Sequence, residues 1–318
     1  YRTNAQSRAL EEKLMIHIIP YKMYGGQNFY QRKEIKDILA YLKSIDNGLD
    51  GQAVKRIINV PMRGIGNTTI DRLQEYADFN DITFWEALVN AKDIDTIKNA
   101  ALSKLEPFVD LIGRLRAKEE FMSLKELAEA VIEDTGYIES LSQNETVEEV
   151  EARRENLDEF INKVVSYEES CKEAGEEPTL SGLLEEVALI ADIDNLDESE
   201  PHVMLMTLHS AKGLEFPIVY MTGMEDGLFP SYMTIVSDDS TEIEEERRLC
   251  YVGITRAEKI LNLTSAKSRM VRGETQMNKV SRFIDEIPKD YMHIENNSSG
   301  YAKGRIACLL YTSPSPRD

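Results

Sequence analysis

The chain has 318 residues, of which 42% are hydrophobic and 30% charged, and its formal net charge is −20 at pH 7. This composition excludes a disordered or fibrous protein, and no apolar run reaches the roughly 20 residues that a membrane-spanning helix needs, so we expect no membrane partner. Three widely spaced cysteines indicate neither a disulfide framework nor a zinc site, which favours a cytoplasmic protein without a bound metal of its own.

The negative charge is concentrated in the middle of the chain. Residues 101–200 carry a net charge of −19, whereas residues 1–100 carry +1 and residues 201–318 carry −2. Residues 1–70 alone carry +5. A chain divided in this way can bind a polyanion with its ends while its middle repels one, so the overall charge does not exclude nucleic acid.

The first part of the chain is expected to form a helix over residues 4–15 and a strand over Met15–Ile19. After the Gly25-Gly26 turn, apolar residues with a 3.6-residue period predict a helix over Arg32–Ser44. Helical patterns then continue to about Leu196, and they cover Thr69–Phe79, Ala100–Arg116, Leu124–Glu133, Val147–Glu169 and Leu180–Ala191.

The pattern changes after Pro201, where short strands alternate with a helix. The strands are expected at Val203–Thr207, Ile218–Met221 and Lys259–Thr264, and the helix at Ile243–Thr255. Buried strands separated by helices are typical of a parallel sheet. We therefore predict an α/β domain made of residues 1–30 and 197–291, interrupted by an all-α insertion over residues 31–196.

The C-terminal tail shows no periodicity after Tyr291, and residues 292–318 are expected to be disordered or partly non-native. The last stretch, from Cys308 to Asp318, reads as neither core nor helix cap. We interpret it as a translated sequencing adapter or another foreign join. A disordered native tail is the alternative.

A polar loop follows the strand that ends at Thr207, and residues 207–217 read Thr-Leu-His-Ser-Ala-Lys-Gly-Leu-Glu-Phe-Pro. Ligands of open α/β sheets bind at the carboxyl ends of strands, which places His209, Lys212 and Glu215 at a candidate site. Lys212 or the backbone amides can meet phosphate, and Glu215 can accept hydrogen bonds from a ribose. The alternative is a solvated turn with a structural histidine.

A second charged segment covers residues 244–259, and we expect a helix with Glu244 and Arg248 paired four residues apart. Arg256 stands at its C-terminal end, where a guanidinium can reach a nucleotide phosphate as an arginine finger. The alternative is that Arg247, Arg248 and Arg256 only neutralise the neighbouring glutamates.

These two segments resemble motifs V and VI of superfamily 1 DNA helicases of the UvrD/PcrA/Rep type. Residues 1–8, 29–37 and 61–66 resemble the same family in the same order, and the resemblance runs from Tyr1 to about Tyr291. It implies two RecA-like, P-loop-type motor domains, each with an inserted helical subdomain. This chain would be the C-terminal half, with the second motor domain split around its insertion.

The resemblance implies translocation from 3′ to 5′ on single-stranded DNA and unwinding at single-strand/duplex junctions, driven by ATP with Mg²⁺. It also implies work in DNA repair or replication, with proteins of those pathways as partners. Carried onto this sequence, Arg256 is the arginine finger and Glu215 binds the ribose. Lys212 and Gly213 shape the nucleotide-side loop.

The DNA contacts that the resemblance implies come from several segments. Thr207 and His209 lie beside single-stranded DNA and link its movement to ATP, and Arg2 and Asn4 contact the strand. Where relatives often have an aromatic residue before a glycine, this chain has Arg272, so stacking by its guanidinium or a phosphate contact replaces base stacking, or the contact is absent.

The Gly64-Ile65-Gly66 segment resembles a duplex-contacting turn akin to a helix-hairpin-helix. Glycines let the backbone approach a phosphate, and Thr68 is expected to cap the following helix. The nearby basic residues Arg56 and Arg63 favour a DNA contact by this turn, and Arg63 is itself a candidate DNA-binding residue. An ordinary helix–helix connection is the alternative.

Two parts of an ATPase are not found in the sequence. It contains no Gly-Lys dipeptide and hence no phosphate-cradling loop, and Asp158-Glu159 lies in a polar helical stretch that we interpret as a solvated face. We therefore expect one wall of an ATP site, completed by an N-terminal half, and no hydrolysis by this chain alone. The alternatives are a non-catalytic DNA- or partner-binding module and the helicase part of a helicase–nuclease. Glu215 and Arg256 together favour a motor.

Overall fold

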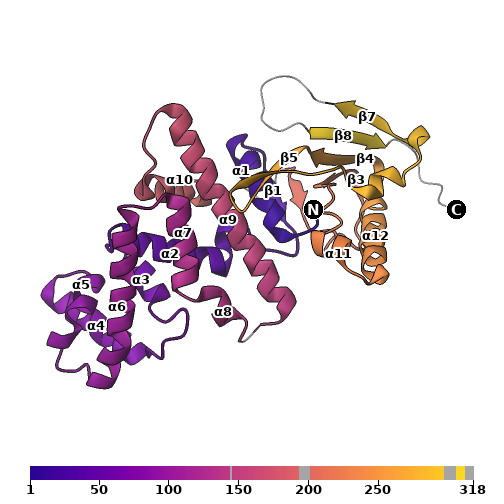
Figure 1. Cartoon of the computed structure of the whole chain (residues 1–318). Helices are drawn as coiled ribbons and strands as arrows, with labels where there is room; N and C mark the ends of the chain where they lie inside the picture. The colour runs from indigo at the N-terminus through magenta and orange to yellow at the C-terminus, as the bar shows by residue number, and fades with distance from the viewer. Residues whose placement is uncertain (144, 193–200, 297–305, 312–318) are drawn as a thin grey trace. The chain divides into compact units, whose positions relative to one another are not determined.

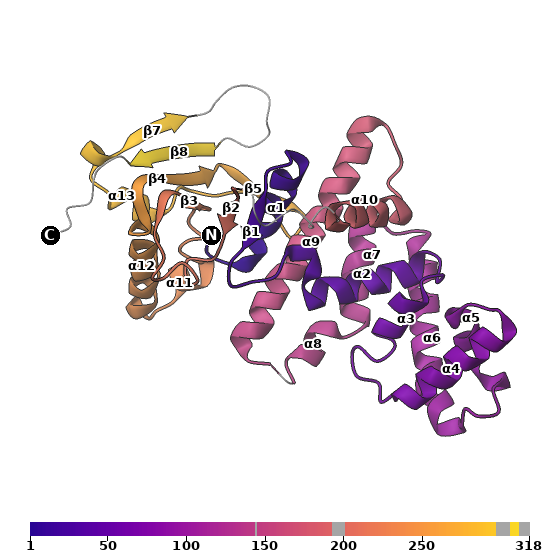
Figure 2. The ribbon, with the colours of Figure 1, turned by 180° about the vertical axis from the view of Figure 1, so that it is seen from behind.

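The computed structural model describes residues 1–143, 145–192, 201–296 and 306–311. The chain divides into two compact units, which Figures 1 and 2 show from opposite sides. Unit 1 consists of Tyr1–Asn28 and Asp197–Asp318, and unit 2 consists of Phe29–Leu196. In the described ranges, no helix is long and apolar enough to cross a membrane.

The regular elements described in unit 2 are helices. They are the 3₁₀-helices η2 (Phe29–Gln31) and η3 (Ala91–Asp93) and the α-helices α2 (Lys33–Asp46), α3 (Gly51–Ile57), α4 (Asn67–Asn80), α5 (Phe84–Val89), α6 (Asn99–Glu119), α7 (Leu124–Asp134), α8 (Tyr137–Leu141), α9 (Val147–Ala174) and α10 (Leu180–Asp192). Helices α5, α7 and α9 each begin with a capping box, in which a Ser or Thr and a Glu three residues later satisfy each other's backbone amides. Local sequence therefore fixes where these helices start.

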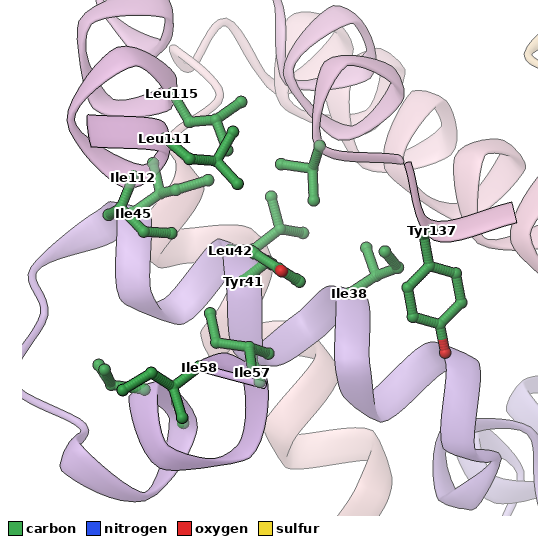
Figure 3. Packing of buried hydrophobic residues seen from close by; sticks show 14 of the residues in the cluster. Ile38, Tyr41, Leu42, Ile45, Ile57, Ile58, Leu111, Ile112, Leu115 and Tyr137 are labelled. Carbon is green, nitrogen blue, oxygen red and sulfur yellow. The ribbon is translucent and has the colours of Figure 1, made fainter. Parts of the chain in front are cut away.

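Helix α2 lies at the centre of unit 2 and contacts α3, α6, α7, α9 and α10. Its apolar residues recur three or four positions apart, so they form one buried stripe. Figure 3 shows this stripe facing α3 and α6, with the labelled side chains Ile38, Tyr41, Leu42, Ile45, Ile57, Ile58, Leu111, Ile112 and Leu115. Each buried aliphatic side chain stabilises the fold by about 1.5–3 kcal/mol.

Two buried carboxylates on α2 join it to neighbouring helices. Asp37 accepts hydrogen bonds from Arg56 Nε (2.7 Å) and from the Tyr137 hydroxyl (2.7 Å). Glu34 accepts one from Arg153 Nη1 (2.7 Å). A buried polar group is costly unless it is hydrogen-bonded, so these contacts fix how α3, α8 and α9 pack on α2.

Unit 1 contains helices and strands. Its helices are η1 (Asn4–Gln6), α1 (Ser7–Ile16), α11 (Tyr232–Val236), α12 (Ser240–Ile254), α13 (Arg282–Asp285) and η4 (Lys289–Tyr291). Its strands are β1 (Tyr21–Met23), β2 (Val203–Leu205), β3 (Phe216–Thr222), β4 (Ala257–Ala266), β5 (Ser268–Val271), β6 (Glu274–Met277), β7 (His293–Asn296) and β8 (Ile306–Tyr311). The chain is therefore an α/β protein.

The strands of unit 1 form three sheets. Strands β1 and β2 pair in parallel, although unit 2 separates them in the sequence. Strands β3 and β4 also pair in parallel, and β8 and β7 extend this sheet in antiparallel fashion. Strands β5 and β6 form a hairpin. A buried cluster that includes Met221 of β3, Cys250 of α12 and Leu261 of β4 packs α12 against the sheet.

Three expectations from the sequence differ from this structure. Helix α1 continues to Ile16 and ends through Ile18 in a left-handed conformation (φ 54°), so the first strand is Tyr21–Met23 and not Met15–Ile19. The four-stranded sheet is mixed, whereas a parallel sheet was expected. No regular element was predicted after Tyr291, yet strands β7 and β8 lie there. Strand β8 forms by pairing with the open side of β4, which is far away in the sequence.

Candidate nucleotide and nucleic-acid sites

The loop between β2 and β3 holds its polar residues outward by burying two apolar ones. Leu208 and Ala211 are buried, and the amide of Ala211 donates to the carbonyl of Thr207 (3.0 Å). The Thr207 hydroxyl accepts from the amide of Ser210 (3.2 Å), which closes a tight turn. The remaining residues of the candidate site in this loop are exposed, and they are His209, Lys212, Gly213 and Glu215. Gly213 has φ 87°, which a side chain would strain.

Arg256 lies directly after α12 and is bonded to the same loop. Its Nη1 donates to the carbonyl of Leu214 (2.8 Å), and its Nε donates to the carbonyl of Val252 (2.8 Å). The amide of Phe216 donates to the carbonyl of Arg256 (2.9 Å). The structure thus brings Arg256 beside Glu215, which lies between Leu214 and Phe216 in the chain. A guanidinium and a carboxylate at one place can serve the phosphate and the ribose of a nucleotide.

The neighbouring arginines of α12 bind glutamates. Arg248 pairs with Glu245, not with Glu244 as expected, and Arg247 pairs with Glu244 and Glu286. The interpretation of charge neutralisation therefore describes Arg247 and Arg248. It does not describe Arg256, whose hydrogen bonds go to backbone carbonyls and to a threonine hydroxyl.

The N-terminal segment runs along the start of the same loop. The backbone nitrogen of Tyr1 donates to the carbonyl of Met206 (3.1 Å), and the amide of Leu208 donates to the carbonyl of Tyr1 (2.9 Å). Asn4 is exposed at the start of η1. The two segments of unit 1 therefore bring together Arg2, Asn4, Thr207 and His209.

Arg2 does not extend freely into solvent. Its Nε and Nη2 both donate to the carboxylate of Glu246 on α12, at 2.9 and 2.7 Å, and Glu246 is buried. The pKa of His209 is lowered, first by partial burial and then by the positive charge of Arg2. The negative charge of Glu246 raises this pKa, but by less. The imidazole is therefore neutral at physiological pH and can donate one hydrogen bond and accept another.

The turn at Gly64-Ile65-Gly66 connects α3 to α4 in unit 2. Gly64 has φ 71°, Ile65 is buried, and Gly66 is the N-cap residue of α4. Among the residues that the structure describes, no side chain caps α4, so the expected cap by Thr68 is wrong. Lys104 Nζ from α6 donates to the carbonyl of Gly64 (2.8 Å), which places a cation at this turn.

The two arginines near this turn bind inside unit 2. Arg63 Nη1 donates to the carbonyl of Ile57 (2.9 Å), its Nη2 donates to the Tyr41 hydroxyl (2.6 Å), and its guanidinium lies over the ring of Phe108. Arg56 binds the buried Asp37. The structure therefore gives both guanidinium groups internal partners, whereas the sequence predicted a DNA contact for Arg63.

Arg272 and Gly273 form the two-residue turn of the β5–β6 hairpin, both with positive φ (53° and 72°). The base of this hairpin is held by Glu225, which is fully buried. Its carboxylate accepts from Arg269 Nε (2.9 Å), from Arg269 Nη2 (2.8 Å) and from the amide of Ala266 (2.7 Å). Burial raises the pKa of Glu225, but these contacts lower it by more, so the carboxylate is charged.

Three residues that shape these sites, Lys104, Glu225 and Glu246, were not predicted from the sequence. One of them left a recognisable signal. Glu246 is four residues before Cys250 and seven before Gly253, and these three form the buried face of α12. A glutamate on the apolar face of a helix indicates a buried ion pair. The partner, however, lies more than two hundred residues away in the sequence.

Comparison with known proteins identifies the family of the chain. An ATP-dependent DNA helicase PcrA of Staphylococcus aureus (strain Mu50 / ATCC 700699) is 48% identical over 300 residues, which cover 94% of this chain and 40% of the relative. A protein of the same name from Staphylococcus epidermidis (strain ATCC 12228 / FDA PCI 1200) is 47% identical over 292 residues, which cover 92% and 39%. The chain thus spans about two fifths of the length of these relatives. Because residues 1–268 match the UvrD-like helicase C-terminal domain, the chain belongs to that family.

Proposed function

We propose that this chain is the C-terminal part of an ATP-dependent DNA helicase that moves from 3′ to 5′ on single-stranded DNA and unwinds duplex in DNA repair or replication. Unit 1 is the second RecA-like motor domain, and unit 2 is its helical insertion. The observation that carries the proposal is the hydrogen bond from Arg256 to Leu214, beside Glu215. A pure binding module has no use for a ribose acceptor next to an arginine finger.

On the nucleotide side, ATP supplies the free energy, and Mg²⁺ neutralises charge on its phosphates. Arg256 exchanges the carbonyl of Leu214 for phosphate oxygens, because a guanidinium binds a phosphate more strongly than a neutral carbonyl. Glu215 orients the ribose, and Lys212 and Gly213 shape the loop. The described residues contain no cluster of acidic, histidine or cysteine side chains that could hold a metal. We place the Mg²⁺ ligands in the N-terminal half.

On the DNA side, Arg2, Asn4, Thr207 and His209 contact the single strand. Because Arg256 and these residues flank one loop, a change at the nucleotide moves the residues that hold the strand. The Gly64-Ile65-Gly66 turn contacts the duplex through its backbone amides, with Lys104 beside it. Arg272 contacts the strand at the tip of the β5–β6 hairpin.

Single-strand binding is tested by salt dependence. If several Lys and Arg side chains contact phosphates, the affinity of the 318-residue chain for an oligonucleotide falls steeply between roughly 50 and 200 mM salt. Fluorescence anisotropy measures this fall. A flat response contradicts DNA binding and favours a protein-binding module.

Nucleotide turnover is tested with the same chain. We expect no DNA-stimulated ATP hydrolysis, because the sequence contains no Gly-Lys dipeptide and hence no phosphate-cradling loop. Measurable turnover that requires Arg256 would refute the division of the ATP site between two halves. In a protein that includes the N-terminal half, Arg256→Ala is expected to abolish turnover while single-strand binding remains.

A further inference from the structure

The ion pair between Arg2 and Glu246 joins a partly exposed arginine to a buried glutamate. The side chain of Glu246 is 7% exposed and that of Arg2 is 25% exposed. Glu246 meets Arg2 from the side, because Nε and Nη2 share its carboxylate at distances of 2.7–3.2 Å. Both short bonds end on Oε1, and Nε also lies 3.2 Å from Oε2, so two nitrogens of the guanidinium are held by one carboxylate and its plane is fixed.

The opposite edge of the same guanidinium points away from Glu246. An arginine has five N–H donors, and the carboxylate engages those of Nε and one of Nη2. No group in the described part of the chain bonds to Nη1 of Arg2. The N–H groups of Nη1 therefore remain available as donors in a fixed orientation. His209 lies close enough for the charges of Arg2 and Glu246 to act on its pKa.

We propose that Glu246 is a positioning residue of the single-strand site, which holds the Arg2 guanidinium in the plane where its free edge binds a DNA phosphate beside His209. The proposal rests on the proposed DNA binding of unit 1 and adds a residue to it. Glu246 itself does not touch DNA, because it is buried behind Arg2.

The position of Glu246 on α12 gives this contact a second consequence. Arg256 follows ten residues later, two residues after α12 ends, so about 15 Å of chain at 1.5 Å per residue connects the two. Arg2 is thus attached to the helix that leads to Arg256. A displacement of Arg256 at the nucleotide is transmitted through α12 to the guanidinium that holds the strand.

A purely structural ion pair is the competing explanation. Removing one partner of a buried pair destabilises a protein whatever the function of the pair. The two explanations differ in what Glu246 does once Arg2 is absent. A positioning residue that acts through Arg2 has nothing left to position, so its loss then costs no further DNA affinity.

The test uses four variants of the 318-residue chain, Arg2→Ala, Glu246→Gln, the double variant and Glu245→Gln, with a single-stranded oligonucleotide as the probe. Glu245 is the matched control, since it lies on the same helix, is exposed and pairs with Arg248. We expect Arg2→Ala and Glu246→Gln each to weaken binding about tenfold, the value of one lost charge-assisted hydrogen bond. The double variant binds like Arg2→Ala, and Glu245→Gln binds like the unaltered chain.

In the same variants, NMR titration measures the pKa of His209. This pKa depends on Arg2 and Glu246 only while the loop is folded. Arg2→Ala raises the pKa of His209 because a repelling cation is removed, and Glu246→Gln lowers it because an attracting anion is removed. Opposite shifts are not expected from a general loss of structure. Shifts in the same direction, or none, contradict the contact on which the proposal rests.

Two results in the binding assay would refute the positioning role of Glu246 and leave the proposed DNA binding of unit 1 intact. Either Glu246→Gln binds DNA as tightly as the unaltered chain, or it weakens the Arg2→Ala variant by a further factor of ten. Failure of the unaltered chain to bind the oligonucleotide at low salt is a different outcome. It refutes the proposed DNA binding and this proposal with it, while the titration of His209 still reports the ion pair.

Discussion

Replacement of Arg63 by alanine tests whether this arginine supports unit 2 or contacts DNA. Its guanidinium holds the chain between α3 and α4, where it bonds to Ile57 and Tyr41 and lies 5.0 Å from the ring centroid of Phe108. The variant leaves these two polar groups without their donor. We therefore expect a loss of unfolding free energy and a small change in DNA affinity.

The magnitude follows from the contacts. Hydrogen bonds to a charged donor contribute about 1.5–3 kcal/mol each, and a cation–π contact adds about 0.5–1 kcal/mol. Arg63 is partly exposed, so we take the lower ends of these ranges for its two hydrogen bonds and its cation–π contact and expect a loss of about 3.5 kcal/mol. With a urea dependence of about 2 kcal/mol per molar, the midpoint of unfolding decreases by roughly 1.8 M. Arg63→Lys recovers little of this, because a single ammonium cannot replace the fork.

The assay is urea unfolding followed by tryptophan fluorescence. The chain contains one tryptophan, Trp85 in α5, so the signal reports unit 2. Arg72→Ala is the control, since Arg72 makes one exposed hydrogen bond to the carbonyl of Thr96 and its loss is expected to cost less than about 0.5 kcal/mol. An unchanged midpoint for Arg63→Ala, together with a decrease of about one in the salt slope of duplex binding, would refute the structural role.

Three further predictions concern unit 1 and the glycine turn. Glu225→Gln destabilises unit 1, and because the folded pKa of Glu225 is lowered, its stabilisation is present above the ordinary value of 4.5 and is lost as the pH falls below it. Thermal unfolding should therefore show a difference from the unaltered chain that narrows at acidic pH; a difference that widens there contradicts this sign. Gly253→Ala places a Cβ 2.6 Å from Leu208 and 2.8 Å from Met221, so α12 shifts and the melting temperature decreases by calorimetry, whereas an unchanged temperature would show that the side chains yield. Gly64→Ala strains a residue with φ 71° and is expected to weaken duplex binding in anisotropy more than single-strand binding; equal effects on both would contradict a duplex role for the turn.

The helices of unit 2 could be predicted because their signals are local. The helix expected over Arg32–Ser44 is confirmed as α2, and the one expected over Leu124–Glu133 is confirmed as α7, within one or two residues at each end. Apolar periodicity and a capping box both depend on residues that are close together in the sequence. The first strand was placed too early, because Ile18, not a glycine, adopts the left-handed conformation that follows α1 and delays the strand to Tyr21.

Side-chain partners could not be predicted in the same way. The internal role of Arg63 depends on Tyr41 and Phe108, which α2 and α6 bring to it from distant parts of the sequence. The same holds for Arg2 and Glu246. Sequence patterns identified which segments carry chemistry, whereas tertiary packing decides which charged groups already have a partner.

The pairing of β1 with β2 has a consequence for how the protein is made. These strands lie on either side of unit 2 in the chain, and at about 5–20 residues per second the ribosome completes β2 roughly 10–40 s after β1. Unit 2 can fold in that interval, which replaces an open loop of about 180 residues by a compact body before the strands must meet. The candidate single-strand site, which combines Arg2 and Asn4 with Thr207 and His209, therefore cannot assemble until unit 2 has been synthesised.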